Sequence, residues 1–293
     1  MHRRTMILSA AACGLIGGAA TAGEPAGAPA QTHAPVQAVE RRLSARIGVF
    51  ARNLQTGRRY GHRAEERFAM CSTFKASLAA ACLQRHDAGE LDLAERIAVR
   101  QADLLPTSAV TRQYAGQGGL DIRTLCQAAV EYSDNTAANL LLRRLGGPAE
   151  LTRFFRGLGD RTSRLDRVEM ALNANLPGDP RDTTTPRAMA DNLRRLTVET
   201  EVLATPSRDL LIGWMRNERN ARDRIRAAVP GDWIVANKPG TTPNGAANDI
   251  ATLWSPEGVA LVVAIYIDTP RGSTRAAVAE VRRIAEHAIG AVL

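Results

Sequence analysis

The chain has 293 residues, of which 45% are hydrophobic and 23% are charged, and its formal net charge is +8. This composition is typical of a globular protein and excludes collagen-like, low-complexity and highly charged disordered chains. The basic residues are spread along the chain without a basic stripe, and aromatic residues make up only 4%, so we expect no nucleic-acid partner. A solvated basic surface or a small anionic substrate suits the charge better.

The first residues have the pattern of an export signal. Arg3-Arg4 is a basic start, residues 6–20 are apolar and small, and Ala20-Thr21-Ala22 has the form of a cleavage site. The apolar run is too short for a spanning helix, so we predict a signal peptide over 1–22, a periplasmic or secreted protein and no membrane span. The paired arginines leave a twin-arginine route open, and Cys13 leaves a lipoprotein as an alternative.

Elements of both kinds follow in chain order. Residues 23–35 are rich in Ala, Pro and Gly and are predicted to be a disordered mature N-terminus. The apolar run 47–51 and the turn signal Gln55-Thr56-Gly57 predict a hairpin. Apolar periodicity and end signals then predict helices over 72 to about 87, 122–131, 135–145, 186–196 and 208–217.

One long segment and the C-terminal part differ from these helices. Residues 164–185 have little periodicity and contain two prolines, and long loops inside compact domains are usually functional. Near its end the chain changes to strands, which are predicted over 233–236, 249–254 and 259–267. An amphipathic helix over 276–289 follows them.

Strands at both ends of the chain with helices between them predict one antiparallel sheet, built from both termini, plus an inserted helical domain. We therefore predict an α+β fold, an α/β/α sandwich, with an α/β domain over 36–68 and 213–293. The helical domain would cover 69–212 and include the loop 164–185. A catalytic cleft would lie between the two domains.

Three cysteines remain if the signal is removed, namely Cys71, Cys82 and Cys126. An odd number leaves at least one thiol free. Cys82 and Cys126 could pair, but both lie in apolar helical patterns, and two buried thiols are the simpler interpretation. Nothing near Cys71 in the sequence would lower its pKa, so we expect it to pack rather than to react.

Only two of the 38 lysines and arginines are lysines, and both stand in motifs with catalytic character. Lys75 closes Ser72-Thr73-Phe74-Lys75, which places Ser72 and Lys75 on one face at a helix start. The helix N-terminus supplies positive potential beside Ser72, which suits a serine that attacks an acyl carbon. Lys75 or a second base would take its proton, because a buried lysine can become neutral whereas arginine cannot.

Two further motifs follow in order. Ser133-Asp134-Asn135 stands before a helix, and Lys238-Pro239-Gly240 follows a strand. Each alone has an ordinary structural interpretation, as a helix cap and as a strand end. The three motifs together, in this order and context, favour a catalytic function. The sequence shows no His, Cys and Asp cluster typical of zinc sites, so we expect neither a metal nor another cofactor.

With these motifs the chain resembles the class A serine β-lactamases, for which they form a known set. Residues 164–173 and 181–186 are similar to the family's Ω loop, and the resemblance covers the chain from about residue 36 to its end. It implies the fold shared by β-lactamases and DD-peptidases. It also implies hydrolysis of the β-lactam amide bond of penicillins, cephalosporins or both, which would confer resistance. We expect a monomer that binds a small-molecule substrate.

The resemblance implies a catalytic role for each matching residue. Ser72 would attack the β-lactam carbonyl and form an acyl-enzyme. Either Lys75 or Glu169 would be the base for this step, a point that is disputed for the family. Glu169 with Asn173 would hold the hydrolytic water, and Ser133 would relay a proton to the leaving nitrogen.

Binding and structural roles follow in the same way. Asn135 would bind the amide of the substrate side chain, and Lys238 would attract the substrate carboxylate. Backbone N–H groups of Ser72 and Thr241 would form the oxyanion hole, beside Gly240. Structural roles would fall to Asp134 and to an ion pair that closes the Ω loop, formed by Arg167 and Asp182.

The chain departs from the family at several positions. Pro239 replaces a hydroxyl residue that would bond the substrate carboxylate, which puts affinity or spectrum in doubt, although an edge strand tolerates proline. Ala247 stands where many members have an arginine, and Arg224 could supply that contact or could be a solvated helix residue. Thr107 replaces an aromatic residue at the cleft rim, and Thr242 replaces the cysteine that would bridge to Cys71 in some members.

Two alternatives to a β-lactamase remain. A DD-peptidase shares the three motifs, and a β-lactam-binding module shares the scaffold. A DD-peptidase-like penicillin-binding protein would trap its acyl-enzyme, and Glu169 with Asn173 argue against it because they form a deacylating water site. A catalytically weak β-lactam-binding module is favoured only by Pro239. The fold alone would not distinguish these functions.

Overall fold

The computed structural model describes residues 32–269 and 273–293. The signal peptide predicted for 1–22 lies outside these residues, as does most of the segment 23–35 that was predicted to be disordered. Helix α1 (Ala34–Leu43) begins inside that segment, with a proline in its first turn. The prediction of disorder is therefore wrong for residues 34 and 35, because proline fits a first helical turn, where its missing N–H is not needed.

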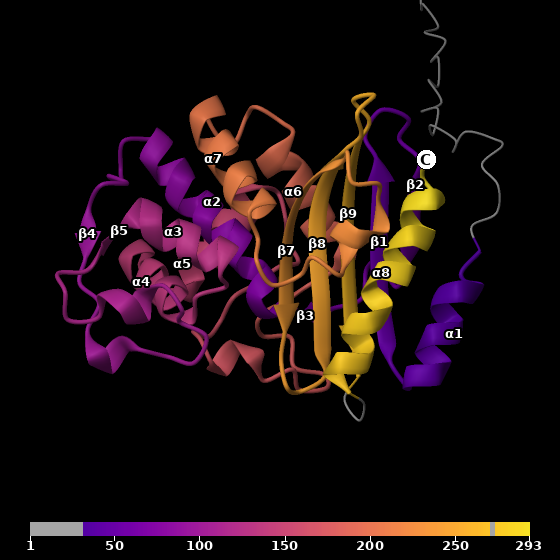
Figure 1. The fold of residues 1–293 in the computed structure, drawn as a ribbon, viewed down its shortest axis with the longest axis horizontal. Helices are drawn as coiled ribbons and strands as arrows, with labels where there is room; N and C mark the ends of the chain where they lie inside the picture. The colour runs from indigo at the N-terminus through magenta and orange to yellow at the C-terminus, as the bar shows by residue number, and fades with distance from the viewer. Residues whose placement is uncertain (1–31, 270–272) are drawn as a thin grey trace, which may run out of the picture. The chain divides into compact units, whose positions relative to one another are not determined.

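A five-stranded sheet carries the fold, in the order β2-β1-β9-β8-β7 (Figure 1). All neighbouring strands are antiparallel. The strands come from both ends of the described chain, as β1 (Arg46–Asn53), β2 (Arg59–His62), β7 (Ile234–Thr241), β8 (Ala246–Trp254) and β9 (Ala260–Asp268). The predicted α+β class, with one antiparallel sheet built from both ends, is confirmed.

Helices cover both faces of this sheet, which explains why β9 is an almost unbroken apolar run. Successive side chains of a strand point to opposite faces. Ala264 and Tyr266 pack into one core with the large group of helices, and Val263 and Ile265 pack into a second core. Helices α1 and α8 (Thr274–Gly290) belong to the second core and lie on the opposite side of the sheet from α6 and α7 (Figure 1).

The helical part is organised around α2 (Phe74–Asp87), in which every residue from Phe74 to Leu83 is buried. A helix that is apolar all round belongs inside a protein. Accordingly, α2 contacts its neighbours α3 (Ile122–Glu131), α4 (Asn135–Leu145), α5 (Pro148–Gly157) and α7 (Thr205–Arg216). The carboxylates of Asp121 and Asp134 cap the N-termini of α3 and α4 by accepting backbone N–H groups.

The sequence analysis predicted neither α1 nor α5. It took Gly146-Gly147-Pro148 only as the end of the helix predicted over 135–145. The same three residues end α4 and begin α5. Gly146 adopts a left-handed conformation with φ 105° at the C-terminus of α4, and Pro148 occupies the first turn of α5.

The loop predicted over 164–185 is irregular, apart from a 3₁₀ turn at Ala171–Asn173 and strand β6 (Thr183–Thr184). Strand β6 pairs with β3 (Phe68–Ala69), and the loop then leads into α6 (Pro186–Thr197). The remaining short elements are β4 (Arg96–Ile97), β5 (Leu120–Asp121) and the 3₁₀ turns Cys71–Thr73, Gln101–Asp103, Thr111–Tyr114 and Ile225–Ala228.

Residues 32–293 form one compact unit, and the division into domains at 36–68, 69–212 and 213–293 stays a prediction. Among the described residues, no helix combines the length and the apolar character that crossing a membrane requires.

The tight packing between the sheet and α6 gives a stability prediction at Gly48 of β1. A Cβ atom there would lie 2.4 Å from Phe68 Cε2 and 2.7 Å from Pro186 Cγ. We expect Gly48→Ala to lower the free energy of unfolding by about 1–3 kcal/mol, measured by urea denaturation. Gly61→Ala in β2 is the matched control, because its Cβ atom would meet Ala64 at 3.4 Å. Equal stability of the two variants would contradict this packing.

Candidate active site

Ser72 lies in the 3₁₀ turn that leads into α2, and its side chain is partly exposed. The preceding Cys71 has φ 46°, a left-handed conformation that a residue with a Cβ atom adopts only when its surroundings hold it. Gly240 of β7 lies directly against this turn, since a Cβ atom there would be 3.0 Å from Ser72 N and 2.9 Å from Met70 O. The contact between two backbones therefore requires glycine at 240 and fixes Ser72 beside strand β7.

Lys75 follows one helical turn later and is fully buried. Its Nζ lies 3.1 Å from Ser72 Oγ, 2.8 Å from Ser133 O, 2.5 Å from Asn135 Oδ1 and 3.0 Å from Glu169 Oε1. Burial is the largest influence on the pKa of Lys75 and lowers it, whereas the Glu169 carboxylate acts in the opposite direction. The amine thus joins four of the predicted site residues.

Ser133 lies between the two lysines of the chain. Its Oγ accepts a hydrogen bond from Lys238 Nζ at 3.1 Å and lies 3.5 Å from Lys75 Nζ. Burial, and then the charge of Lys75, lower the pKa of Lys238 to about 7. The hydroxyl therefore contacts two amines whose environment favours loss of a proton, which suits a group that passes protons on.

Glu169 enters the site from the loop, with its side chain fully buried. Asn173 Nδ2 donates to Glu169 Oε2 at 2.5 Å. Asn139 of α4 holds the backbone at Glu169 on both sides, because its Nδ2 donates to Glu169 O and its Oδ1 accepts from Glu169 N, each at 2.9 Å. The peptide bond between Glu169 and Met170 is cis. The carboxylate is thus held by contacts to its side chain and to its backbone.

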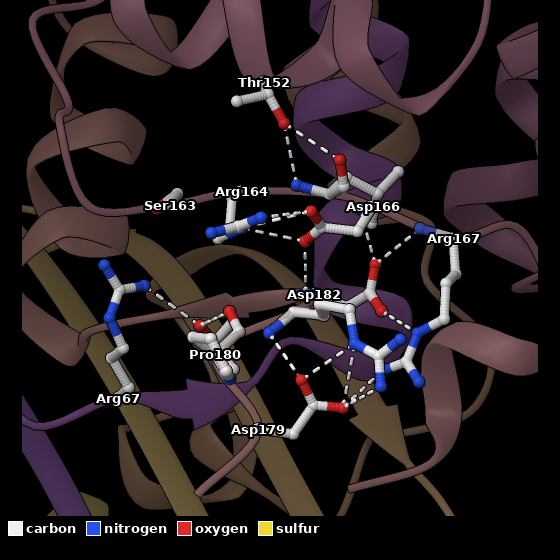
Figure 2. Close-up of polar contacts among 12 residues, drawn as sticks. Arg67, Thr152, Ser163, Arg164, Asp166, Arg167, Asp179, Pro180 and Asp182 are labelled. Atoms are coloured by element: carbon white, nitrogen blue, oxygen red, sulfur yellow. Dashed lines mark hydrogen bonds and ion pairs between the residues drawn. The ribbon is translucent and has the colours of Figure 1, made fainter.

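A partly buried network centred on the buried Asp182 fixes the loop that carries Glu169 (Figure 2). Arg167 Nε donates to Asp182 Oδ2 at 2.5 Å, and Asp182 Oδ1 accepts the backbone N–H groups of Asp166 and Arg167 at 2.7 and 2.9 Å. Asp166 returns the contact by accepting Asp182 N at 3.0 Å. Asp182 O also accepts Met70 N at 2.9 Å, two residues before the candidate nucleophile. The loop is thereby tied to the segment that carries Ser72.

Asp134 and Asn135 are neighbours in sequence but face different surroundings. Asp134 is fully buried and accepts hydrogen bonds from the backbone and hydroxyl of Thr111, besides capping α4. Asn135 faces the site, where its Nδ2 donates to Pro106 O at 2.8 Å and to Met170 Sδ at 3.0 Å. Asp134 is therefore placed to support the structure, and Asn135 to meet a ligand.

A cavity of about 580 Å³ lies in front of these groups. Lys75, Glu169 and Lys238 are buried and contact residues of its wall. A larger hollow of about 700 Å³ lies against loop residues 175–181 but contains none of the predicted catalytic residues. The smaller cavity is lined by the other predicted catalytic and binding residues, namely Ser72, Ser133, Asn135, Asn173, Arg224, Gly240 and Thr241.

Arg224 also lines this cavity and is nearly buried. Its Nη1 donates to Asn248 O at 2.7 Å, and its buried Nε has no hydrogen-bond partner among the described residues. The alternative of a solvated helix residue is therefore wrong, because the side chain is covered. Nearby Asp249 is fully buried, and burial raises its pKa to about 7 against the opposing charge of Arg224.

The positions at which the chain departs from the expected pattern lie around the same cavity. Pro239 lies on β7, an edge strand of the sheet, as the sequence analysis required. Thr107 lines the cavity, and Thr242 donates its hydroxyl to Asn173 O at 3.0 Å. Cys71 is a free, buried thiol whose pKa is raised by burial.

The other two thiols of the described chain are also free and buried, which agrees with the simpler interpretation of the sequence. Cys82 of α2 and Cys126 of α3 contact each other, and this contact and burial raise the pKa of Cys126. Both thiols lie in the helical core.

Sequence reasoning missed two residues of the site, Asn139 and Met170. Asn139 follows Asn135 by four residues on α4, so the helical period alone places both on one face. That signal was available and could have identified it. Met170 had no such signal, because its contact with Asn135 depends on how the loop folds over α4.

Comparison with known proteins agrees with this arrangement. The model of the β-lactamase enzyme family matches residues 32–292. The chain is 41% identical to the carbapenem-hydrolyzing β-lactamase KPC of Klebsiella oxytoca, over 99% of this chain and 98% of that protein. It is 47% identical to a β-lactamase of Mycobacterium tuberculosis H37Rv, over 80% of this chain and 76% of that protein.

Solved structures give the same result. The class A β-lactamase of the last common ancestor of Gram-negative bacteria is similar with a TM-score of 0.85 and 46% identity, over 88% of this chain and 98% of that chain. A β-lactamase from Xanthomonas campestris is similar with a TM-score of 0.83 and 42% identity, over 87% of this chain and 94% of that chain.

The loop network gives a prediction at Asp182, whose carboxylate is fully buried. We expect Asp182→Asn to lower the free energy of unfolding by about 1.5–3 kcal/mol, because the Arg167 guanidinium loses its charged acceptor. In the same variant, amide hydrogen exchange in residues 164–185 should become faster. The control is Arg181→Ala, since that side chain is 50% exposed and should change stability by less than about 0.5 kcal/mol. Unchanged exchange in Asp182→Asn would show that the ion pair does not hold the loop.

Proposed function

We propose that Ser72 is the nucleophile of this chain. The chain belongs to the β-lactamase enzyme family and hydrolyses β-lactams by the class A serine mechanism, which requires a serine nucleophile. The observation that carries the proposal is the position of Lys75 Nζ, 3.1 Å from Ser72 Oγ and 3.0 Å from Glu169 Oε1. One amine thus links the hydroxyl that must lose a proton to a carboxylate that can accept it.

Acylation begins when Ser72 Oγ attacks the β-lactam carbonyl carbon. Its proton passes to Lys75, directly or onward to Glu169, and a neutral amine is accessible because burial lowers the pKa of Lys75. The backbone N–H groups of Ser72 and Thr241 stabilise the oxyanion, and the close approach at Gly240 supports this geometry. The C–N bond then breaks, and Ser133 gives its proton to the departing nitrogen while it takes from Lys75, 3.5 Å away, the proton that Ser72 lost.

Deacylation depends on Glu169 and Asn173. The Glu169 carboxylate takes a proton from a water molecule, which attacks the ester carbonyl. Ser72 Oγ leaves with a proton from Lys75, which is replenished from Glu169. Asn173 orients the carboxylate through the bond from its Nδ2, and Asn139 fixes the backbone that carries it. The pairing of Glu169 with Asn173 supports hydrolytic turnover over the trapped acyl-enzyme of a DD-peptidase-like protein. It also argues against a weak binding module.

Substrate recognition uses the polar groups of the cavity wall. Asn135 binds the amide of the acyl side chain, and Lys238 attracts the carboxylate. Pro239 offers neither a hydroxyl nor an N–H group to that carboxylate. Arg224 supplies the missing contact, because it lines the cavity and its guanidinium can donate to a carboxylate.

We also propose that the protein is exported to the periplasm or secreted and acts as a monomer. The pattern of basic, apolar and small residues over 1–22 supports export. The monomer stays a prediction from the sequence.

The proposed roles predict two different defects. Ser72→Ala should abolish nitrocefin hydrolysis and give no covalent adduct. Glu169→Gln should still acylate but should lower kcat about 10²–10⁴-fold, because the base for deacylation is lost. Mass spectrometry of each variant mixed with a penicillin measures the adduct over seconds to minutes. A persistent adduct in the unaltered protein, without turnover, would contradict the deacylating role of Glu169.

The pKa of Lys238 predicts a pH dependence. Only the charged amine attracts the carboxylate, so kcat/KM should fall as the pH rises through about 7. Between pH 6 and pH 8.5 we expect a decrease of up to about thirtyfold, because the charged fraction of the amine falls from about 0.9 to about 0.03. Lys238→Arg keeps its charge and should remove this decrease. If the unaltered enzyme and Lys238→Arg showed the same pH profile of kcat/KM, Lys238 would not be the group that causes the decrease.

The same pKa has a defined effect on stability. The folded-state pKa of about 7 lies below the ordinary value of 10.5, so the folded protein disfavours the charged amine. The contribution of Lys238 to the free energy of unfolding therefore increases as the pH rises from about 7 towards 10.5.

A further inference from the structure

Both N–H donors of the Asn135 side-chain amide are occupied, so neither is free for the carbonyl of a ligand. An amide nitrogen carries two N–H donors. Asn135 Nδ2 uses them on Pro106 O at 2.8 Å and on Met170 Sδ at 3.0 Å. Its Oδ1 accepts from Lys75 Nζ at 2.5 Å. A substrate carbonyl that binds Asn135 Nδ2 must therefore displace Pro106 O or Met170 Sδ.

Met170 is the partner that can leave. Lys75 is fully buried, and Pro106 contributes a backbone carbonyl whose movement would require the chain to move. Met170 is 41% exposed, lines the cavity and has an unbranched side chain that can change rotamer. A thioether is also a weak acceptor compared with an amide carbonyl, so the exchange favours the substrate.

We propose that Met170 is a specificity-determining residue: its thioether occupies the Asn135 N–H that an acylamino side chain of a substrate needs, and is displaced when that side chain binds. The inference rests on the role proposed for Asn135. Substrates with an acylamino carbonyl must displace the thioether, whereas 6-aminopenicillanic acid, which lacks that carbonyl, need not. Met170 therefore sets the preference between these two classes of β-lactam.

The same thioether is the accessible site of oxidation in the described chain. Met70, Met189 and Met215 are fully buried, and only Met170 among the described methionines is exposed. Hydrogen peroxide would transfer one oxygen atom to its sulfur and leave as water, so the sulfur is oxidised and the peroxide is reduced. The sulfoxide oxygen is a stronger acceptor than the thioether. Oxidation should therefore strengthen the contact that a substrate has to break.

The direct test compares benzylpenicillin with 6-aminopenicillanic acid. Met170→Leu has a similar volume but no acceptor, so kcat/KM for benzylpenicillin should rise about two- to fivefold while that for 6-aminopenicillanic acid stays unchanged. Val168→Ala is the matched control, because Val168 is equally exposed on the same loop but does not line the cavity. An equal change for both substrates, or no change for either, would overturn the inference.

Asn135→Ala separates this inference from the proposed function. It should lower kcat/KM for benzylpenicillin more than for 6-aminopenicillanic acid. If Asn135→Ala does not discriminate between them, the proposed role of Asn135 fails and the inference fails with it. If Asn135→Ala discriminates and Met170→Leu does not, the inference alone fails.

Oxidation provides a second test on the unaltered enzyme. After treatment with hydrogen peroxide, peptide mass spectrometry should find one added oxygen on Met170 and none on the buried methionines. The ratio of kcat/KM values for benzylpenicillin and 6-aminopenicillanic acid should then fall about threefold or more, as expected for a stronger competing hydrogen bond. Met170→Leu should be insensitive to the same treatment. Oxidation of Met170 that leaves this ratio unchanged would contradict the competition.

Discussion

A charged amine buried away from water requires polar partners on every side, because desolvation of an unpaired ion costs several kcal/mol. Lys75 meets this requirement with groups from three separate parts of the chain, the start of α2, the start of α4 and the loop that carries Glu169. The need to surround one amine therefore brings the catalytic groups together. The same burial lowers the pKa of Lys75, so the constraint that assembles the site also makes its central amine able to exchange a proton.

The site keeps several residues in conformations that the backbone disfavours. Cys71, Ser133 and Asp182 have positive φ values of 46°, 57° and 59° although none is glycine. Such residues persist only where the surrounding structure determines them. Here that structure consists of the buried helix α2, the edge of the sheet at β7 and the charged network of the loop. The rigid fold thus maintains the strained turns on which Ser72 and Ser133 are presented.

The sequence predicted the class of fold and the identity of most site residues, because both depend on signals that are local in the chain. The apolar run of β9 and the spacing of Ser72 and Lys75 are such signals. What it missed depends on contacts between distant segments. Met170 reaches Asn135 only after the loop has folded onto α4, and Arg224 is nearly buried only because β8 lies beside it. The start of α1 at Ala34 was missed for a different reason, since an Ala- and Pro-rich composition is compatible with both disorder and a helix start.

Because Pro239 offers no hydrogen-bond donor to a substrate carboxylate, the binding of that carboxylate depends on the cationic groups at the cavity, Lys238 and Arg224. Lys238 is titratable there, because burial and Lys75 bring its pKa to about 7, whereas a guanidinium remains charged at every relevant pH. An anion bound by Lys238 alone would lose its attraction as the pH rises. Arg224 places a guanidinium on the same cavity wall. Both lysines of the chain thus lie where burial lowers the pKa of an amine, and Arg224 adds a second cation to the cavity wall.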